Sequence, residues 1–408
     1  MKLKTIPEDF FVEELPFNFP TETSRGDYSF YRLEKKNWTT TDALSTVRRR
    51  WEIPMNRLGW GGLKDRHAHT IQYFSIFHGP RRGMEHSTFT VHYIGTRSNP
   101  YSSTDFYGNR FRLILRDLRA DERLALTSAF AELEQTGVVN YFDDQRFGSV
   151  TDGKSFIARE MVLENYEGAL KLALCGEYAF DPREAREEKE TLLKYWNEWT
   201  ECRAHLQRGH ARSLVCYMQE HPTDFKGAVL RLRPELQGLY LSAWQSHLWN
   251  RMVSRALETR IPADQLTTLP LKTASVVTPK RIPEELKTFW EESVLPLVSA
   301  RLKPQEGAWW TGLVDDIMRE EGLELAKMKI RGADKPFFSR GERHISLRPA
   351  NVTWAIADDD RNRGRQKMKL EFDLPRGAYA TMVVKFLNTA TGTTTPDEEE
   401  PPAESPVE

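Results

Sequence analysis

The order of two hydrophobic patterns along the chain constrains its fold more than any single motif does. From the start to about residue 118, and again at residues 368–374, apolar and polar residues alternate in short pieces, which is the period of half-buried strands. Between these regions apolar residues recur at helical spacing, as in Leu241, Trp244 and Leu248. This order predicts an α+β chain in which a mainly helical domain is inserted into a discontinuous domain with a mixed, mainly antiparallel sheet flanked by helices.

The same patterns predict individual strands and helices. The expected strands are residues 28–33, 71–77, 89–94, 111–115, 368–374 and 379–387. A first helix is capped by Thr41 or Asp42 and runs to about Trp51, and a second begins at Asp121 and stops at Gly137. In the middle of the chain the expected helices are residues 155–176, 183–207 and 241–260.

Composition excludes several classes of protein. The 408 residues are 39% hydrophobic, yet no apolar run is long enough to cross a bilayer, and the N-terminal sequence has no signal-peptide core. The three cysteines are widely spaced and fit neither a disulfide framework nor a zinc knuckle. We therefore expect a cytoplasmic protein, with a monomer as the default state.

The net charge of −1 conceals a basic N-terminal region. Residues 389–408 carry six acidic side chains and no Lys or Arg, and we expect them to form a disordered acidic tail. Residues 1–116 hold 18 Lys and Arg against 12 Asp and Glu. Such an excess suggests a polyanionic partner, most often RNA or DNA, although any single basic run can equally be a solvated surface.

Asp65 is the leading candidate for a reactive side chain. It lies between Lys64 and Arg66, three residues after Gly62, and Gly61 and Gly62 allow a sharp turn that exposes the carboxylate. The neighbouring cations would favour the ionised form. On spacing alone, however, a charged surface turn explains the segment better, because isolated acidic residues are common in loops.

Five segments resemble, in order, the motifs of the TruD family of tRNA pseudouridine synthases. They are Lys4 with Pro7-Glu8-Asp9-Phe10, Gly62-Leu63-Lys64-Asp65-Arg66-His67-Ala68, Gly108-Asn109-Arg110-Phe111, Asn140-Tyr141-Phe142-Asp143-Asp144-Gln145-Arg146-Phe147-Gly148 and Leu374-Pro375-Arg376-Gly377-Ala378-Tyr379. The resemblance covers essentially residues 1–388 and is weaker in the middle of the chain. It implies a pseudouridine synthase catalytic domain in two parts, residues 1–150 and 343–388, an inserted TRUD domain at residues 151–342, and a tail at 389–408.

The resemblance implies that the chain isomerises a uridine of tRNA, at position 13, to pseudouridine. The reaction needs no redox change and no cofactor. Asp65 would be the nucleophile, attacking the sugar or base covalently or abstracting a ribose proton, and the sequence does not choose between these routes. Lys4 is the family-implied partner that keeps Asp65 ionised and orients it, with Lys64 and Arg66 as nearer alternatives in sequence.

Substrate-binding roles are expected for a further set of residues. Phe111 could stack on the detached uracil while Asn109 hydrogen-bonds the base, although Phe111 could equally be a core residue on its strand. The remaining candidates for contacts with the tRNA are Tyr379, Lys64, Arg66, Lys35 and Arg146.

Other functions are also considered. His67 and His69 could share one strand face, but no third ligand lies nearby in sequence, so no metal site is expected. The sequence has neither a phosphate-binding glycine loop nor a dinucleotide motif. A non-catalytic RNA-binding protein or RNA chaperone on the same fold is the main alternative. A nucleoside glycosidase is another, and it would need a second acid that the sequence does not place.

Overall fold

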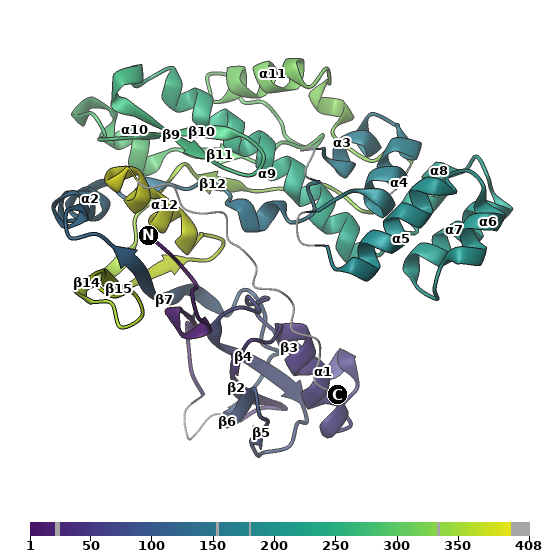
Figure 1. Cartoon of the computed structure of the whole chain (residues 1–408), viewed down its shortest axis with the longest axis horizontal. Coiled ribbons are helices and arrows are strands. Elements are labelled where there is room, and N and C mark those ends of the chain that lie inside the picture. Colours follow the sequence, from purple (N-terminus) through teal and green to yellow (C-terminus); the bar gives the residue numbers. More distant parts are fainter. Residues whose placement is uncertain (21–24, 152–154, 179–180, 333–334, 393–408) are drawn as a thin grey trace. The chain divides into compact units, whose positions relative to one another are not determined.

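The computed structural model describes residues 1–20, 25–151, 155–178, 181–332 and 335–392. These form two compact units, each considered by itself (Figure 1). The first comprises Met1–Val138 with the described residues from Leu347 onward, and the second comprises Val139–Ser346. Residues 393–408, most of the predicted acidic tail, lie outside the described residues.

A nine-stranded sheet organises the first unit. Eight of its strands follow the order β14-β15-β7-β1-β4-β2-β6-β5. The ninth, β3, pairs with the C-terminal part of β4. The strands are β1 (Phe10–Pro16), β2 (Tyr28–Lys36), β3 (Leu58–Trp60), β4 (His69–Phe77), β5 (Met84–Glu85), β6 (Phe89–Arg97), β7 (Phe106–Leu118), β14 (Ala350–Asp358) and β15 (Gln366–Pro375). Only the β1–β4 pair of this sheet is parallel, so the predicted mixed, mainly antiparallel sheet is confirmed.

Three helices cover this sheet in two groups: α1 (Thr40–Arg50), α2 (Glu122–Thr136) and α12 (Ala380–Thr391). Helix α1 buries Leu44 and Val47 against apolar residues of β2 and β4. Helices α2 and α12 share a second core with β7 and β15, which includes Phe111, Phe130 and Leu387 (Figure 1). The burial of these apolar stripes is what holds the helices on the sheet.

The second unit is mainly helical. Its helices are α3 (Ile157–Val162), α4 (Tyr166–Cys175), α5 (Arg183–Lys194), α6 (Trp199–His205), α7 (His210–Glu220), α8 (Phe225–Leu230), α9 (Pro234–Glu258), α10 (Lys287–Glu292) and α11 (Thr311–Glu320). Its short strands are β9 (Leu266–Pro270), β10 (Ser275–Pro279), β11 (Val294–Pro296) and β12 (Glu342–His344). The chain passes between the units within β8 (Val138–Val139) and β13 (Ser346–Leu347).

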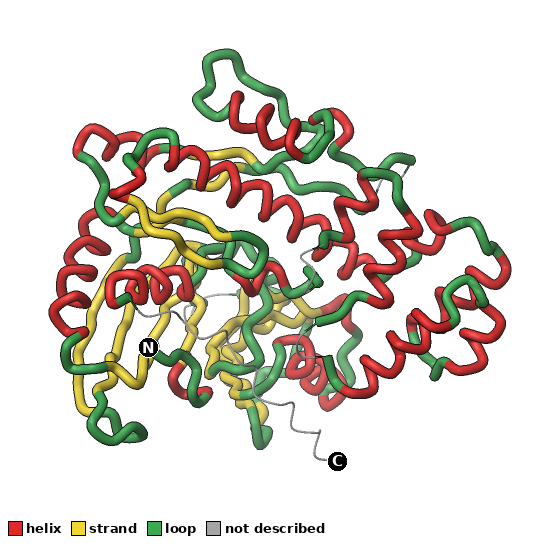
Figure 2. Tube along the Cα trace, turned by 45° about the horizontal axis from the view of Figure 1, so that its top comes forward, coloured by secondary structure: helices red, strands yellow, loops and turns green. Residues whose placement is uncertain are grey.

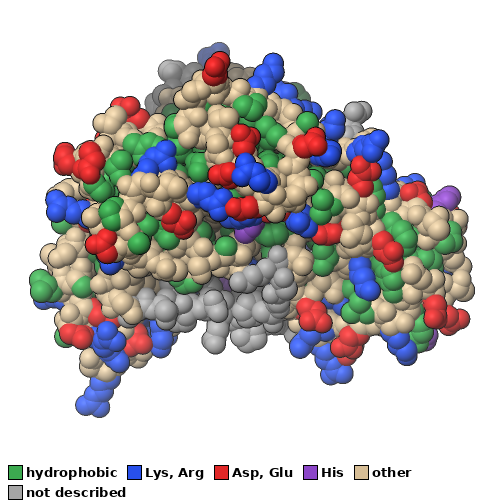
Figure 3. All heavy atoms as spheres, turned by 90° about the horizontal axis from the view of Figure 1, so that it is seen from above, with side chains coloured by type: hydrophobic (Ala, Val, Ile, Leu, Met, Phe, Trp, Pro, Cys, Tyr) green, Lys and Arg blue, Asp and Glu red, His purple; other side chains and the backbone are tan. Residues whose placement is uncertain are grey.

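The long helix α9 forms the centre of the second unit (Figure 2). It buries Trp244 and Trp249 completely, so both side chains belong to the core of this unit. Its exposed side carries Arg251 and Arg255, which form ion pairs with Glu320 of α11. On the face of the molecule drawn in Figure 3, Lys and Arg side chains lie intermixed with Asp and Glu.

The helices predicted at residues 155–176 and 183–207 are each two shorter helices, α3 with α4 and α5 with α6, and one predicted strand is wrong. Residues 379–387, expected as a final strand, belong almost entirely to helix α12. Ala380, Val383, Val384 and Leu387 are all buried, and their spacing of three and four residues places them on one helical face. The two adjacent β-branched valines favoured the strand prediction, but packing against the core overrides that local preference.

The other predicted strands lie within β2, β4, β6, β7 and β15, whereas β1, β3, β5 and β14 of this sheet are not predicted. Helix α1 is capped two residues before the nearer predicted cap, Thr41, because the Thr39 hydroxyl accepts a hydrogen bond from the Asp42 amide as its N-cap. Helix α2 ends at Gly137, whose φ of 73° suits glycine at this position, as expected.

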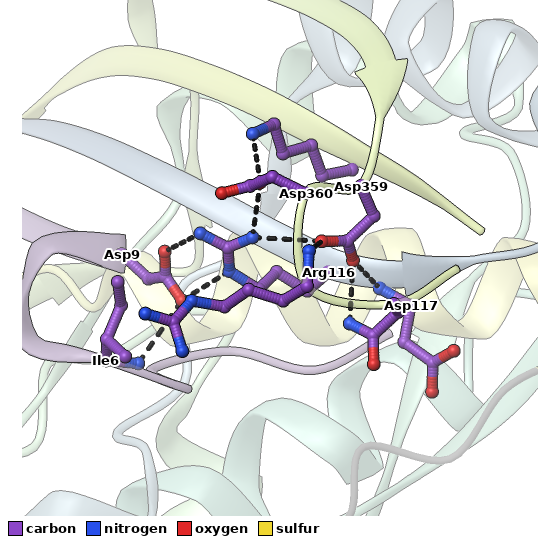
Figure 4. A network of polar contacts seen from close by, with 9 residues as sticks. Ile6, Asp9, Arg116, Asp117, Asp359 and Asp360 are labelled. Atoms are coloured by element: carbon purple, nitrogen blue, oxygen red, sulfur yellow. Dashed lines mark hydrogen bonds and ion pairs between the residues drawn. The ribbon is translucent and has the colours of Figure 1, made fainter. Parts of the chain in front are cut away.

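A buried arginine joins the N-terminal segment to the rest of the first unit (Figure 4). Arg116 of β7 donates to both oxygens of Asp9 at 2.8 Å, and through Nη1 to Asp359 at 3.0 Å and Asp360 at 2.9 Å. The main chain of the same residue exchanges two 2.9 Å hydrogen bonds with Lys2. Arg116 therefore anchors the chain on both sides of Lys4.

We predict that Arg116→Met lowers the free energy of unfolding by about 3 to 5 kcal/mol, because it leaves the buried carboxylates of Asp9 and Asp359 without their guanidinium. Arg112 lies on the same strand, but its side chain is 47% exposed beside Glu371. Arg112→Met should therefore cost less than about 1 kcal/mol. Urea unfolding of both variants tests this, and equal losses would contradict it.

Candidate active site

Asp65 lies in the loop that joins β3 to β4, and two groups hold its carboxylate. Oδ2 accepts a hydrogen bond from Lys4 Nζ at 2.8 Å, and Oδ1 accepts one from the His67 amide at 3.2 Å. The Asp65 side chain is 31% exposed, whereas that of Lys4 is only 12% exposed. The structure thus brings together the two residues expected to be catalytic, which are separated by 61 positions in sequence.

Lys4 adopts an uncommon backbone conformation. Its φ of 58° lies in the left-handed region, which costs free energy for a residue with a side chain and persists only where the surroundings impose it. Here the hydrogen bonds between Lys2 and Arg116 fix the preceding chain. The ammonium lies 4.6 Å from the centre of the Phe10 ring, on the side of β1 that is buried. Lys4 is thus held in place from several directions.

The surroundings of Asp65 favour its ionised form. Burial by itself would raise the pKa of this carboxyl group. The charge and hydrogen bond of Lys4, together with the hydrogen bond from the His67 amide, outweigh that effect and hold the pKa of Asp65 below its usual range. The side chain is therefore an anion at neutral pH, and its partial exposure leaves it open to a substrate.

Lys35 does not lie where a phosphate contact would require. Its side chain is completely buried, and Nζ donates to the main-chain carbonyls of Asp65 at 2.8 Å and Trp38 at 2.5 Å. Burial, with a smaller contribution from the Lys64 charge, lowers the pKa of Lys35 to about 8 against the opposing effect of Asp65. The predicted contact with RNA is corrected to a contact with the candidate loop itself.

Lys64 also differs from its expected roles. Its ammonium lies 2.7 Å from Glu14 Oε1, and both side chains are nearly buried. The other Glu14 oxygen accepts from the Tyr73 amide at 3.1 Å and the Tyr101 hydroxyl at 3.3 Å. Lys64 is thus engaged by Glu14 rather than by Asp65 or solvent. Arg66, in contrast, is exposed beside Asp65, where it can meet an anionic ligand.

Two further polar residues, not predicted, fix the loop. The Thr40 hydroxyl accepts from the Lys64 amide at 2.9 Å and donates to Gln72 Oε1 at 2.8 Å. Gln72 Nε2 then donates to the Gly62 carbonyl at 3.3 Å. Both side chains are buried, and buried polar groups are normally hydrogen-bonded. A glutamine at an inward position of a strand was the signal in the sequence that could have revealed this contact.

Asn109 and Phe111 are two residues apart on β7, so their side chains lie on the same face of the strand. Phe111 is only 7% exposed, with its ring centre 6.2 Å from Phe10 and 5.6 Å from Phe372. This position agrees with the core interpretation, and the role of Phe111 in binding uracil stays a prediction. Asn109 Oδ1 is buried and has no hydrogen-bond partner among the described residues, so it could accept a hydrogen bond from a ligand.

The remaining candidates are less closely tied to Asp65. Tyr379 directly precedes α12 in the first unit and is half-buried. Arg146 belongs to the second unit, where its guanidinium lies 5.3 Å from the Phe142 ring centre and 3.5 Å from the Ser242 hydroxyl. The contacts of both with tRNA stay predictions.

The two histidines of the segment do not form a metal site with the described residues. His69 Nε2 lies 2.7 Å from Glu34, and His67 contributes its main-chain amide to Asp65. Nowhere in the described parts of the chain do three or more His, Cys, Asp or Glu side chains gather as metal ligands would. No described helix is long and apolar enough to span a membrane.

Comparisons with known proteins place this geometry in context. A family model described as tRNA pseudouridine synthase D (TruD) matches residues 1–386. The chain is 30% identical over 395 residues to a protein of Methanococcus maripaludis named probable tRNA pseudouridine synthase D 1, covering 94% of this chain and 98% of that protein. It is 25% identical over 397 residues to tRNA pseudouridine synthase D of Aquifex aeolicus, covering 95% and 98% respectively.

A crystal structure from Methanosarcina mazei, described as that of a tRNA pseudouridine synthase D (TruD) assigned by similarity, has the same fold. The TM-score is 0.70, and the match covers 96% of this chain and 94% of that chain at 22% sequence identity.

The buried ammonium of Lys35 gives a prediction about stability and pH. Its pKa is about 8 in the folded protein and near 10.5 in the unfolded chain, so between these values the unfolded chain binds more protons. The stability contributed by this group should therefore rise with pH across that window, by on the order of 3 kcal/mol. Below pH 8 the full cost of burying the charge is present.

Chemical unfolding of wild type and Lys35→Met from pH 7.5 to 10.5 measures this effect as a difference, which cancels the titration of other groups. The advantage of wild type over the variant should increase with pH. Lys36→Met, at the exposed neighbouring position, should show no such trend. A difference that stays constant for Lys35→Met would refute the prediction.

Proposed function

This chain belongs to the TruD family of tRNA pseudouridine synthases, and we propose that it converts uridine 13 of tRNA to pseudouridine with Asp65 as the reacting carboxylate. The observation that carries the proposal is the Lys4–Asp65 pair, which combines an ionised carboxylate with partial exposure. The position within tRNA follows from the resemblance of the whole chain to the family. We also propose that the protein is cytoplasmic and monomeric.

The proposed reaction is an isomerisation that needs no external reactant. The bond from ribose C1′ to N1 of uracil breaks, the base turns within the site, and C1′ joins C5 of the same base. The C5 proton then leaves to solvent, and N1 gains a proton. Asp65 either attacks the nucleoside covalently or removes a ribose proton, and both routes need the carboxylate to begin as an anion.

Lys4 supplies the positive charge that both routes require. An ammonium 2.8 Å from Oδ2 stabilises the anion before reaction and again when the carboxylate is released. Its hydrogen bond also points the carboxylate in one direction, which reduces the freedom lost when the substrate arrives. We therefore assign Lys4 the role of orienting and pairing Asp65.

The remaining roles in the proposal come from the family resemblance, and the positions of Arg66 and Asn109 support the roles of these two residues. Arg66, which is exposed, would contact a phosphate near the target uridine, and Arg146 would contact the RNA backbone from the second unit. Asn109, whose buried Oδ1 has no hydrogen-bond partner in the described part of the chain, would accept a hydrogen bond from the base. Phe111 and Tyr379 would provide aromatic surface for the base.

The glycosidase alternative gains no support from the residues around Asp65. It needs a second carboxyl group that can act as an acid or base opposite the first. Glu14, the buried carboxylate that contacts the neighbouring Lys64, is engaged by that lysine, the Tyr73 amide and the Tyr101 hydroxyl. A non-catalytic RNA-binding protein would not need an ionised Asp65, so turnover decides between these alternatives.

We predict that Asp65→Asn abolishes pseudouridine formation, lowering the rate by roughly 10³-fold or more, since the amide is neither a nucleophile nor a base. The measurement is tritium release from tRNA labelled at uridine C5. The control is a matched tRNA in which position 13 is a cytidine that carries the only tritium, at its C5. The wild type should release no label from it. Undiminished release by Asp65→Asn would exclude the assigned role, and pseudouridine found elsewhere would exclude position 13.

We also predict that Lys4→Met moves the acid limb of kcat/KM toward neutral pH by about 1 to 3 pH units. Removing the paired ammonium raises the pKa of Asp65, so a higher pH is needed to ionise it. Lys2→Met is the control, because its ammonium is exposed and pairs with Asp117 instead. If both variants keep the wild-type pH profile, Lys4 does not control the ionisation of Asp65.

A further inference from the structure

Lys35 is a buried cation with an unusual set of partners. Among the described residues no carboxylate forms an ion pair with it, and its two hydrogen-bond acceptors are both main-chain carbonyls, those of Trp38 and Asp65. Burying an ammonium without a paired anion costs free energy, and a methionine of similar length would avoid that cost. Stability alone therefore does not explain a lysine at this position.

The geometry of the contact indicates what Lys35 does. Its ammonium binds the main chain of Asp65, whereas Lys4 binds the side chain of that residue. The two lysines come from different elements, Lys4 from the N-terminal segment and Lys35 from β2. Asp65 is consequently fixed at its backbone and at its carboxylate by independent supports. A side chain with both ends fixed can sample few positions.

The place of Lys35 in the sheet makes it a firm support. Strand β2 lies between β4 and β6, and Lys35 pairs with Thr70 on one side and Phe89 on the other. The Trp38 carbonyl, its second acceptor, directly precedes the residue that caps α1. The lysine therefore links the loop of Asp65 both to the middle of the sheet and to the start of α1.

We infer that Lys35 is a positioning residue for the reaction of Asp65, acting through the Asp65 main chain and not through contact with RNA. This inference rests on the function proposed above. A positioning residue should affect the chemical step and leave tRNA binding unchanged. A phosphate contact should do the reverse, because each lost contact weakens binding and lowers its dependence on salt.

The test compares Lys35→Met with Lys36→Met in the full chain. Lys36 is the adjacent residue, but its ammonium is exposed near Glu8, so its loss should leave kcat within about twofold of wild type. For Lys35→Met we expect kcat to fall by about 10- to 100-fold, as a displacement of the reacting group by about 1 Å can produce. Binding of tRNA is measured separately in the Asp65→Asn background at several salt concentrations, and it should not change.

A second measurement does not depend on turnover. The amide of His67 donates to the Asp65 carboxylate, and the amide of Lys64 donates to Thr40, so their hydrogen exchange reports the order of the loop. Lys35→Met should speed exchange of these amides at least tenfold, and Lys36→Met should not. Lys35→Arg keeps a charged donor, so it should recover part of both kcat and protection if the methionine variant is poorly folded.

The outcomes separate the inference from the function on which it rests. Weaker tRNA binding, a salt dependence reduced by about one phosphate contact and an unchanged kcat would make Lys35 an RNA contact and overturn the inference. Wild-type kcat and wild-type exchange in Lys35→Met would overturn it as well. If no protein forms pseudouridine, the proposed function fails, and the exchange measurement alone decides whether Lys35 positions Asp65.

Discussion

The buried guanidinium of Arg116 is the interaction on which the candidate site depends. Lys4 comes from an N-terminal segment that, among the described residues, pairs with a strand only through the bridge of Lys2 with Arg116, and it must still reach Asp65 in the β3–β4 loop. The side chain of Arg116 binds Asp9 after Lys4 (Figure 4), and its main chain binds Lys2 before it. A short segment tied on both sides can hold one residue in the left-handed conformation, which a free terminus would not retain.

Three lysines surround the loop of Asp65, and each has a different acceptor. Lys4 binds the Asp65 carboxylate, Lys64 binds Glu14, and Lys35 binds main-chain carbonyls. Glu14 also accepts hydrogen bonds from the Tyr73 amide and the Tyr101 hydroxyl. The arrangement leaves the loop with one more positive than negative side chain among these five. Such an excess favours an anionic Asp65 and an anionic substrate near it.

The sequence was informative about the sheet and less so about the directions of side chains. Alternation predicts β2, β4, β6, β7 and β15, whereas the strand predicted at residues 379–387 is wrong, because these residues form a helix that shares a core with α2. The pairing of Lys4 with Asp65 spans 61 positions, and only the family resemblance suggested it. The burial of Lys35 could have been predicted, because it shares the inner face of β2 with Leu33. The Glu14 partner of Lys64 could not, because it depends on the register between strands.

A reactive carboxylate has to be ionised and accessible to the substrate, and it also has to be held in one position. At Asp65 these two requirements are met by different side chains, Lys4 and Lys35. Exposure to substrate keeps the anion solvated and mobile, whereas burial restricts its motion but favours the neutral acid. At 31% exposure Asp65 lies between these limits. Lys4 offsets the electrostatic cost of partial burial, because its charge lies beside the carboxylate. Lys35 restricts the backbone without covering the carboxylate, because it binds the opposite end of the residue. Lys35 thus fixes the position of Asp65 and Lys4 favours its ionised form, and neither lysine blocks the access of the substrate to the carboxylate.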